Sequence, residues 1–334
     1  MSAQPDQSEN LKCLQTALAS RPVVLVGGPT ASGKSGLAAD VAAAFNGVVI
    51  NADSMQVYRE LDIITARPSA DELTKAPHRL FGVLSGAERC SAARWRALAL
   101  AEIEAAFKAG RLPIVVGGTG LYLRTLEEGL APVPEISEEV RQQTWRDFEQ
   151  LGAEAFHREL ARRDPEMAGR LNVGDTQRLL RAWEVLAATG TSLAEWQARQ
   201  ADNAAQLDPG LSLLKLAVIP PREVIYERCN ARFEAMTAEG AIEEVEALLK
   251  LGLDPALPVM KAIGVREFGA YLAGELSLEA AVSKAQQETR RYAKRQMTWL
   301  RNQYASKNVI ETQYSESLSP KIFNIIRQYL LTLP

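Results

Sequence analysis

The hydrophobic pattern of this chain alternates between short apolar runs and longer amphipathic segments. Apolar runs rich in β-branched residues occur at 23–26, 48–50, 113–116 and 213–219, as is typical of buried strands. The clearest helix-like segment between them spans Ser91 to Ala109, with Ser91 as its predicted N-cap and Gly110 as its stop. This alternation predicts an α/β fold, a doubly wound parallel sheet that binds ligands at the carboxyl ends of its strands.

The stretch between the third and fourth apolar runs is too long for one crossover connection. Its amphipathic segments, near 137–150, 153–163, 176–188 and 192–199, are helix-like. We therefore predict an all-helical insertion domain at residues 132–210, between a first core part at 1–131 and a second at 211–334. After the fourth strand, the pattern predicts further helices near 223–238, 239–251 and 278–302.

Composition narrows the class of protein. The chain has 334 residues, of which 47% are hydrophobic and 24% charged, as in ordinary globular proteins. Residues 1–10 are polar, and no apolar run is long enough to span a bilayer, so we expect a cytoplasmic protein. Three isolated cysteines and two histidines argue against a disulfide framework or a zinc finger. Nothing in the sequence demands a dimer, and we expect a monomer.

A phosphate-binding loop follows the first apolar run. Its residues are Gly28, Pro29, Thr30, Ala31, Ser32, Gly33, Lys34 and Ser35, which fit the pattern G-x-x-x-x-G-K-[ST]. In this pattern backbone N–H groups and the lysine hold a di- or triphosphate, and the hydroxyl of the last residue reaches Mg²⁺. The helix that follows, near 36–45, directs its positive end at the same anion. Alone, the motif indicates an ATP-binding site.

Two other strand ends carry candidate chemistry. Asp53 follows the second strand, where a carboxylate acts as a general base or holds Mg²⁺, although an Asp-Ser pair is also a common helix N-cap. Gln56 offers the donor and acceptor that recognise an adenine edge. The third strand ends in Gly117-Gly118-Thr119-Gly120 rather than in the acid of many nucleotide-hydrolysing proteins. A small-molecule kinase and a transferase with a diphosphate leaving group remain.

A basic stretch near the C-terminus suggests contact with nucleic acid. Residues 284–301 hold six basic side chains and one acid, and on a helix Arg291, Lys294, Arg295 and Thr298 share one face. Taken alone, such a run is more often a solvated helix face than a binding surface. The net charge of −3 excludes a uniformly basic nucleic-acid binder, but not a local basic surface.

Taken in order, these motifs resemble the tRNA dimethylallyltransferase family, in its bacterial type, because the zinc finger of eukaryotic members is missing. The matching segments are Gly28 to Ser35, Asp53-Ser54-x-Gln56-x-Tyr58, Gly117 to Tyr122, Gln177 to Arg181, Lys261 to Arg266 and Lys294 to Arg301. The match covers roughly Val23 to Gln303. It implies a P-loop fold and transfer of a dimethylallyl group from dimethylallyl diphosphate to the exocyclic amine of the adenosine 3′ of a tRNA anticodon.

The resemblance also implies roles for individual residues. Asp53 is the general base, Thr119 lies beside the reacting groups, Arg228 is a further cation on the diphosphate, and Ser35 is a tentative Mg²⁺ ligand. The implied tRNA contacts are Asp53, Ser54, Met55, Gln56, Thr119 and Arg141, with Gln177, Arg178, Leu179, Leu180 and Arg181, then Lys261, Ala262, Ile263, Gly264, Val265 and Arg266, and finally Lys294, Arg295, Gln296, Met297, Thr298, Trp299, Leu300 and Arg301.

Three alternatives stay open. A small-molecule kinase also suits a phosphate loop with a strand-end aspartate, although it has no need of the insertion or the basic segments. Prenylation of free adenine nucleotides uses related chemistry. A non-catalytic RNA-binding protein is disfavoured by the intact Gly33, Lys34, Ser35 and Asp53.

Overall fold

The computed structural model describes residues 7–202 and 210–334. Its central sheet has six strands in the order β3-β2-β4-β1-β5-β6, and neighbouring strands pair in parallel among the described residues. The strands are β1 (Pro22–Gly27), β2 (Gly47–Asn51), β3 (His78–Arg79), β4 (Leu112–Gly117), β5 (Ser212–Val218) and β6 (Asn308–Ile310). The four strands predicted from the apolar runs are confirmed as β1, β2, β4 and β5.

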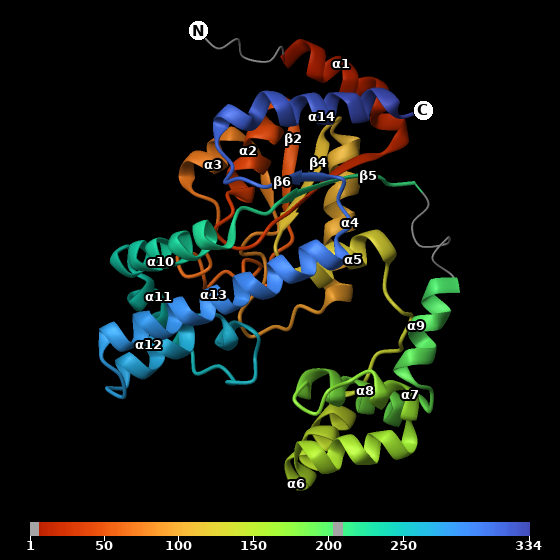
Figure 1. Ribbon diagram of the computed structural model, residues 1–334, viewed down its shortest axis with the longest axis vertical. Helices are drawn as coiled ribbons and strands as arrows, with labels where there is room; N and C mark the ends of the chain where they lie inside the picture. The colour runs from red at the N-terminus through yellow and green to blue at the C-terminus, as the bar shows by residue number, and fades with distance from the viewer. Residues whose placement is uncertain (1–6, 203–209) are drawn as a thin grey trace. The chain divides into compact units, whose positions relative to one another are not determined.

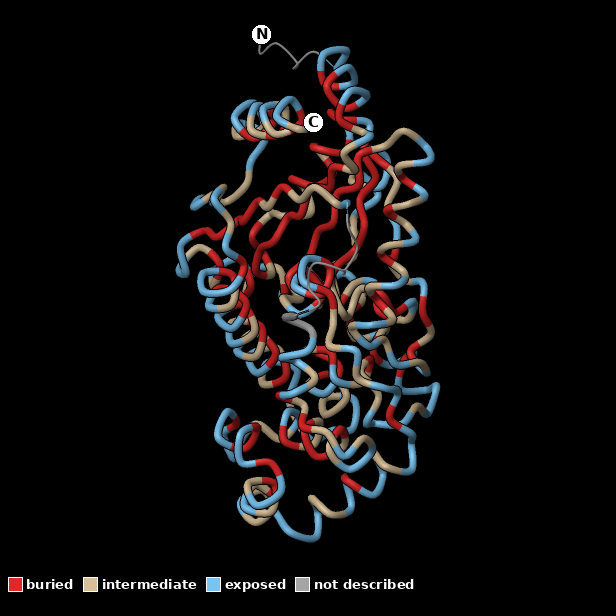
Figure 2. Tube along the Cα trace, turned by 90° about the vertical axis from the view of Figure 1, so that its right-hand side faces the viewer, coloured by how far each residue is buried: buried red, intermediate tan, exposed pale blue. Residues whose placement is uncertain are grey.

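Helices cover both faces of the sheet, so successive side chains of the central strands enter two separate cores. Val24 and Val26 of β1 pack with α1 (Gln7–Ala17), α2 (Lys34–Ala44) and α14 (Ser319–Thr332). Val23 and Leu25 pack on the other side with α4 (Ala92–Lys108), α5 (Gly120–Glu128), α10 (Arg222–Ala238) and α13 (Leu278–Gln303). The strands are accordingly buried along most of their length (Figure 2), and the predicted doubly wound P-loop fold is confirmed.

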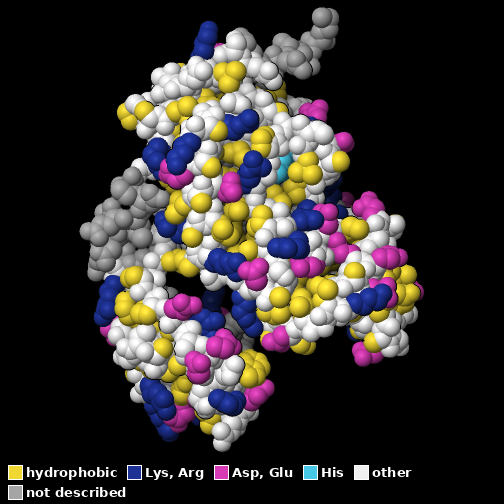
Figure 3. All heavy atoms as spheres, turned by 180° about the vertical axis from the view of Figure 1, so that it is seen from behind, with side chains coloured by type: hydrophobic (Ala, Val, Ile, Leu, Met, Phe, Trp, Pro, Cys, Tyr) yellow, Lys and Arg dark blue, Asp and Glu magenta, His cyan; other side chains and the backbone are white. Residues whose placement is uncertain are grey.

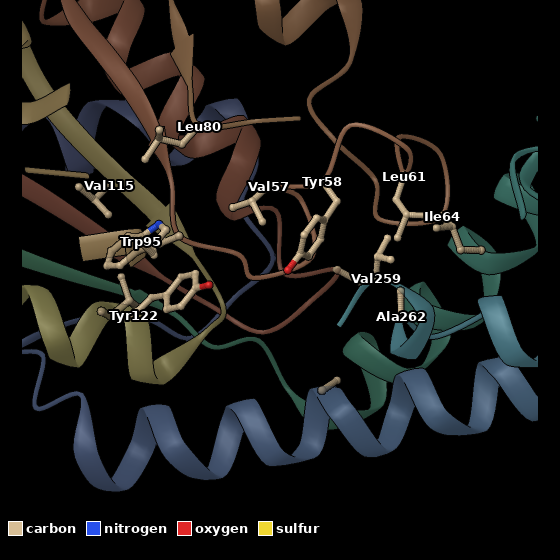
Figure 4. Packing of buried hydrophobic residues seen from close by; sticks show 14 of the residues in the cluster. Val57, Tyr58, Leu61, Ile64, Leu80, Trp95, Val115, Tyr122, Val259 and Ala262 are labelled. Atoms are coloured by element: carbon tan, nitrogen blue, oxygen red, sulfur yellow. The ribbon is translucent and has the colours of Figure 1, made fainter. Parts of the chain in front are cut away.

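One core lies directly beneath the carboxyl edge of the sheet. Trp95 stacks on Tyr122 with ring centroids 4.4 Å apart and donates its indole N–H to the backbone oxygen of Asn51 over 2.8 Å. Figure 4 shows this pair beside Val115 of β4, with Tyr58 from the loop after β2 nearby. This packing fixes the point at which β2 ends and its functional loop begins.

Helix ends follow the predicted capping chemistry. The side chain of Ser91 accepts a hydrogen bond from the backbone N–H of Arg94 at the start of α4, and Gly110 adopts φ 64° just after its end. The Ser91 cap and the Gly110 stop are confirmed. The other α-helices in the unit that contains the sheet are α3 (Ala70–Lys75), α11 (Ala241–Leu249) and α12 (Val265–Leu272).

The chain forms two compact units, one made of residues 1–127 and 210–334 and the other of residues 128–209. The smaller unit holds α6 (Glu138–Arg163), α7 (Pro165–Gly169), α8 (Thr176–Thr189) and α9 (Leu193–Asp202). Its own core is built on Phe156, Leu160 and Trp183. Gly152 breaks α6 into two segments with φ 74° and ψ 162°. Residues 203–209, just before the predicted end of the insertion at residue 210, lie outside the described residues, as do residues 1–6 of the polar N-terminus.

Several elements escaped the sequence analysis. The two-residue strand β3 and the edge strand β6 are too short to produce a pattern, and α14 follows β6 in the C-terminal tail. These tail elements pack against α1 and α2. Among the described helices, none combines the length and apolarity that a bilayer span requires.

Candidate active site

Three strand ends meet at the carboxyl edge of the sheet. The strands β2, β4 and β1 are neighbours, so the loops that follow them start side by side. Backbone hydrogen bonds connect these loops: Gly28 N–H donates to Gly117 O over 3.4 Å, and Thr119 N–H donates to Ala52 O over 3.3 Å. The sheet therefore brings the phosphate loop, Asp53 and the glycine-rich segment together, as predicted.

The phosphate loop connects β1 to α2, which begins at Lys34. Gly33 adopts φ 88°, a conformation that favours glycine. The hydroxyl of Ser32 is buried and has no hydrogen-bond partner among the described residues. The Lys34 ammonium donates to Pro29 O over 3.3 Å. An unpartnered buried hydroxyl and an ammonium held only by a loop carbonyl are what a site for an absent anion would leave.

Electrostatics at the loop also favour an anion. Burial lowers the pKa of Lys34, the negative charge of Asp53 opposes the shift and the positive charge of Arg232 adds to it, and the resulting pKa is about 8. Burial likewise lowers the pKa of Arg232, and the negative charge of Asp53 opposes that shift. Two desolvated cations thus stand near a single carboxylate, and a bound diphosphate would supply the missing negative charge.

Arg232 is a site residue that the sequence analysis missed. It lies on α10, and its guanidinium donates to the hydroxyl of Thr30 in the phosphate loop. The predicted cation, Arg228, lies one helical turn earlier, is exposed, and donates to Ala31 O over 3.1 Å. Both arginines reach the loop, but only Arg232 is half-buried and electrostatically coupled to both Lys34 and Asp53. A spacing of four residues places both on one face of the helix, and this was the available signal.

Asp53 lies in a tight turn after β2. Its Oδ1 accepts from Met55 N–H over 2.9 Å, and its own N–H donates to Asn51 Oδ1 over 2.8 Å. This turn does not start a helix, so the N-cap alternative does not apply here. Thr119 Oγ1 accepts from Ser54 N–H over 3.0 Å, which joins the β4 and β2 loops through the predicted pair. The pKa of Tyr292 on α13 is raised, first by burial and second by the negative charge of the nearby Asp53.

The predicted bidentate recognition of adenine by Gln56 is not supported. Its Nε2 donates to two backbone oxygens, Thr65 O over 3.0 Å and Ala66 O over 2.8 Å. Both donors of the amide are therefore used within the protein, and only Oε1 is left to accept a hydrogen bond. Gln56 instead shapes the loop that carries Asp53.

The basic face of α13 is confirmed as a continuous surface. An open depression of about 420 Å³ is lined by Arg291, Lys294, Arg295, Thr298, Trp299, Asn302 and Gln303. Figure 1 shows α13 running across the lower edge of the sheet. On the face seen in Figure 3, basic side chains are interspersed with acidic ones. The positive surface on α13 is thus local.

Only some side chains of the predicted tRNA segments face solvent. Lys261, Arg266, Lys294, Arg295, Thr298 and Arg301 are exposed. Ala262, Val265, Gln296, Met297 and Leu300 are buried in the larger unit, and Leu179 is buried in the smaller one. Ile263 and Trp299 are half-buried and pack against the larger core. The buried members hold the helices in place, so any tRNA contact by side chains falls to the exposed ones.

In the smaller unit, the predicted contacts lie on two helices. Arg141 on α6 pairs with Glu138 over 3.8 Å. On α8, Arg178 pairs with Asp175 over 3.3 Å and Arg181 with Glu184 over 3.6 Å. Gln177 is exposed and Leu180 is half-buried. The arginines are held only by surface ion pairs one turn away, which water and phosphate groups readily replace.

The predicted Mg²⁺ ligand, Ser35, is half-buried in the first turn of α2, and its hydroxyl makes no hydrogen bond within the described residues. Among all the residues that the structure describes, no group of three or more Asp, Glu, His or Cys side chains could hold a metal ion. Mg²⁺ usually binds through one or two protein ligands together with phosphate oxygens. The residues present fit a cation of this kind, carried in with a diphosphate.

Two family models match the chain. The model described as IPP transferase matches residues 56–303, and the model described as isopentenyl transferase matches residues 21–83. Among curated proteins, a tRNA dimethylallyltransferase of Rhodospirillum centenum is 57% identical over 86% of this chain and 91% of its own length. Another, from Paramagnetospirillum magneticum, is 51% identical over 94% of this chain and 99% of its own length.

Solved structures agree with these matches. The full-length tRNA isopentenylpyrophosphate transferase of Bacillus halodurans is 33% identical, with a TM-score of 0.65 over 93% of this chain and 97% of that one. A eukaryotic dimethylallyltransferase acting on tRNA is 26% identical, with a TM-score of 0.79 over 94% of this chain and 80% of that one.

Proposed function

This chain belongs to the IPP transferase family, and on that premise we propose that it transfers a dimethylallyl group from dimethylallyl diphosphate to tRNA. The acceptor is the exocyclic amine of the adenosine 3′-adjacent to the anticodon, and pyrophosphate is released. The observation that carries this proposal is the meeting of a desolvated cation pair, Lys34 and Arg232, with the single carboxylate of Asp53 at one edge of the sheet.

The cations act on the leaving group. As the bond between the allylic carbon and the diphosphate oxygen breaks, negative charge grows on the diphosphate. Lys34, Arg232 and the N–H groups at the start of α2 are already oriented toward the loop that would hold it. Their positions are fixed before the reaction, so little reorganisation is needed when the charge develops.

Asp53 acts on the acceptor. The adenine amine is a weak nucleophile because its lone pair is delocalised into the ring, and it must lose a proton as the new carbon–nitrogen bond forms. Oδ1 of Asp53 is occupied by Met55 N–H. Its other oxygen is therefore the atom proposed to take that proton, with Thr119 and Ser54 beside it.

Exposed basic side chains act on the tRNA. The adenosine must leave its loop stack to reach the strand ends, and such extrusion is easier in an anticodon loop than in a duplex. Lys294 and Arg295 on α13, with Arg178 and Arg181 on α8, are the charges proposed to hold the phosphate backbone. These contacts position the tRNA, and the bound dimethylallyl diphosphate presents the allylic carbon that reacts.

Mg²⁺ would be held by the Ser35 hydroxyl together with diphosphate oxygens, and it would neutralise charge on the leaving group. We also propose a cytoplasmic location and a monomer. The three cysteines are free, which suits a reducing compartment.

The proposal is tested by incubating the protein with labelled dimethylallyl diphosphate and either tRNA or AMP. We expect label in tRNA, at the adenosine after the anticodon, and AMP at the same concentration should compete poorly. Folded protein that leaves tRNA unlabelled would overturn the proposal. Preferential labelling of AMP would favour an adenine-nucleotide prenyltransferase, and phosphate transfer from ATP to a small hydroxyl compound would favour a kinase.

A further inference from the structure

Gln296 is a buried polar side chain in the middle of the basic helix α13. It is 5% exposed, and both atoms of its amide group are used. Oε1 accepts from the backbone N–H of Thr30 over 2.9 Å, and Nε2 donates to the backbone oxygen of Gly118 over 2.9 Å. One side chain of α13 therefore bridges the phosphate loop and the end of β4.

The bridge leaves no space for a larger residue on the β4 side. A Cβ atom added at Gly118 would lie 2.2 Å from Nε2 of Gln296 and 3.0 Å from the backbone oxygen of Gly28. The glycine at this strand end, which the sequence analysis recorded as a missing acid, is thus explained by the close approach of α13.

On the other side, the bridge reaches a residue that holds the leaving-group cation. Thr30 gives its N–H to Gln296 and receives a hydrogen bond from Arg232 on its hydroxyl. The position of Thr30 therefore sets where the Arg232 contact forms. Gln296 holds the backbone N–H of Thr30 from the side of α13, whereas Arg232 reaches the hydroxyl of the same residue from α10.

The next turns of α13 make further contacts with the β1 end. A Cβ atom added at Gly27 would lie 3.0 Å from both Leu300 and Tyr304, and the Tyr304 hydroxyl donates to Leu25 O over 3.0 Å. The exposed side chains Lys294 and Arg295 directly precede Gln296 on the same rigid helix. A shift of α13 caused by RNA phosphates would therefore be transmitted to the phosphate loop.

We propose that Gln296 is a positioning residue that couples occupation of the basic face of α13 by tRNA to the shape of the diphosphate site. This inference rests on the proposed function. It assigns Gln296 a role different from direct contact with tRNA, because its amide is buried and fully hydrogen-bonded. The reciprocal effect follows by linkage: a bound diphosphate changes the affinity for tRNA by the same factor.

The first test compares Gln296→Met with the matched control Thr289→Val. Thr289 is also a buried polar residue of α13, 8% exposed, and its hydroxyl bonds only to Ala285 O of its own helix. Methionine preserves the volume of glutamine without its hydrogen bonds. We expect Gln296→Met to raise KM for dimethylallyl diphosphate about tenfold, while Thr289→Val leaves it unchanged.

Coupling is measured by titrating pyrophosphate into the protein with and without anticodon stem-loop RNA. In the unmodified protein, we expect the RNA to change pyrophosphate affinity about fivefold or more. In Gln296→Met this factor should approach one, and in Thr289→Val it should be retained. No coupling in the unmodified protein, or unchanged coupling in Gln296→Met, would overturn the inference, and so would an equal loss in the control.

A second variant, Gln296→Glu, separates the hydrogen bonds from the packing. A protonated glutamic acid accepts from Thr30 N–H and donates to Gly118 O as glutamine does, whereas the carboxylate has no donor and repels that oxygen. Burial should raise the pKa of this carboxyl group. At each pH, the pyrophosphate affinity of Gln296→Glu is divided by that of the unmodified protein. This ratio should be close to one at low pH and should fall as pH rises.

Taking this ratio removes the titrations that both proteins share, namely those of pyrophosphate and of Lys34, Arg232 and Tyr292. A ratio that does not vary with pH would contradict the role of the two hydrogen bonds. The inference and the proposed function fail separately: an unmodified protein that does not prenylate tRNA rejects the function, whereas an active protein in which Gln296→Met behaves like Thr289→Val rejects only the inference.

Discussion

At the carboxyl edge of the sheet, charged side chains are held by hydrogen bonds to the loops: the desolvated Arg232 donates to the hydroxyl of Thr30, and Asp53 accepts from the backbone N–H of Met55. On α8 of the smaller unit, Arg178 has a side chain that is 74% exposed and is held only by Asp175. A buried charge fixed in one position can stabilise a transition state. A solvated arginine binds phosphates by charge and adapts to them.

Substitutions at the sheet edge and on α8 should therefore affect different steps of the reaction. Loss of a group at the sheet edge should reduce the rate of the chemical step, because the cost of orienting charge has been met during folding. Loss of a surface arginine should weaken binding by a small, salt-dependent amount.

Asp53→Asn should lower kcat by about 100- to 10,000-fold, because the amide cannot take the proton of the adenine amine. Asparagine keeps an oxygen that can accept from Met55 N–H, so the turn after β2 is preserved. Single-turnover transfer to tRNA measures the effect, and filter binding should show unchanged tRNA affinity. Asp53→Ala, which also removes the turn bond, serves as the comparison. A kcat within about threefold of normal for Asp53→Asn would remove Asp53 from the base role.

Arg232→Gln should lower kcat/KM for dimethylallyl diphosphate by about 100-fold, because one fixed cation on the leaving diphosphate is lost. Arg228→Gln is the matched control, since Arg228 lies one turn away on the same helix, is more exposed than Arg232 and bonds to the backbone oxygen of Ala31 rather than to Thr30. We expect a loss of no more than about threefold there. Steady-state kinetics with saturating tRNA measures both. The reverse order would restore Arg228 as the leaving-group cation predicted from the sequence.

These two arginines show where sequence reasoning stops. The spacing of Arg228 and Arg232 predicts a shared helix face, but which of the two is the less exposed depends on how α10 docks on the loop. In contrast, three parts of the site were predictable from the sequence: the loop from Gly28 to Ser35, Asp53, and Thr119. Each follows a strand that its apolar run reveals, and parallel strands end at the same edge of a sheet.

Contacts between distant segments were beyond the sequence pattern. Gln56 has the chemistry to read an adenine, yet its donors are consumed by Thr65 O and Ala66 O, which no spacing rule reveals. Gln296 lies in a basic run and resembles a surface residue until α13 is placed against Thr30 and Gly118. The C-terminal segment gives a third example: Gln313 and Tyr314 lie against Gly33, although Gln313 is 280 positions further along the chain.

The pH dependence of diphosphate binding sharpens the account of the sheet edge. Lys34 has its pKa lowered to about 8, and the diphosphate binds its protonated form. In the free protein this proton is lost as pH rises through about 8, while a bound anion raises the pKa again. Above that pH, affinity for dimethylallyl diphosphate without tRNA should fall up to about tenfold per pH unit.

Isothermal titration in two buffers of different ionisation enthalpy should show uptake of up to one proton on binding above pH 8. Lys34→Arg retains its charge over this range and should bind without proton uptake. Binding that takes up no proton in the unmodified protein would mean that Lys34 keeps its proton in the free state, and the site would then be less desolvated than its geometry implies.

The smallest effects are expected in the smaller unit. Arg178→Ala combined with Arg181→Ala should weaken tRNA binding about threefold to tenfold and reduce the slope of log affinity against log salt by about 1.5, because two phosphate contacts are lost. The rate at saturating tRNA should be unchanged. The same pair of changes at Lys294 and Arg295 should reduce the slope equally, but it should also alter coupling to pyrophosphate if α13 connects to the phosphate loop through Gln296.

A charge-matched control separates contact from general attraction. Arg162 and Arg170 lie in the smaller unit in similar surface ion pairs, with Glu159 and Glu166, but outside the predicted tRNA segments. Changing both to Ala removes the same charge and should leave the salt slope unaltered, because only cations that neutralise phosphates release counterions. An equal change in slope from both pairs would mean that the unit attracts tRNA as a diffuse charge. The division between a fixed chemical site and discrete surface contacts would then hold only for the larger unit.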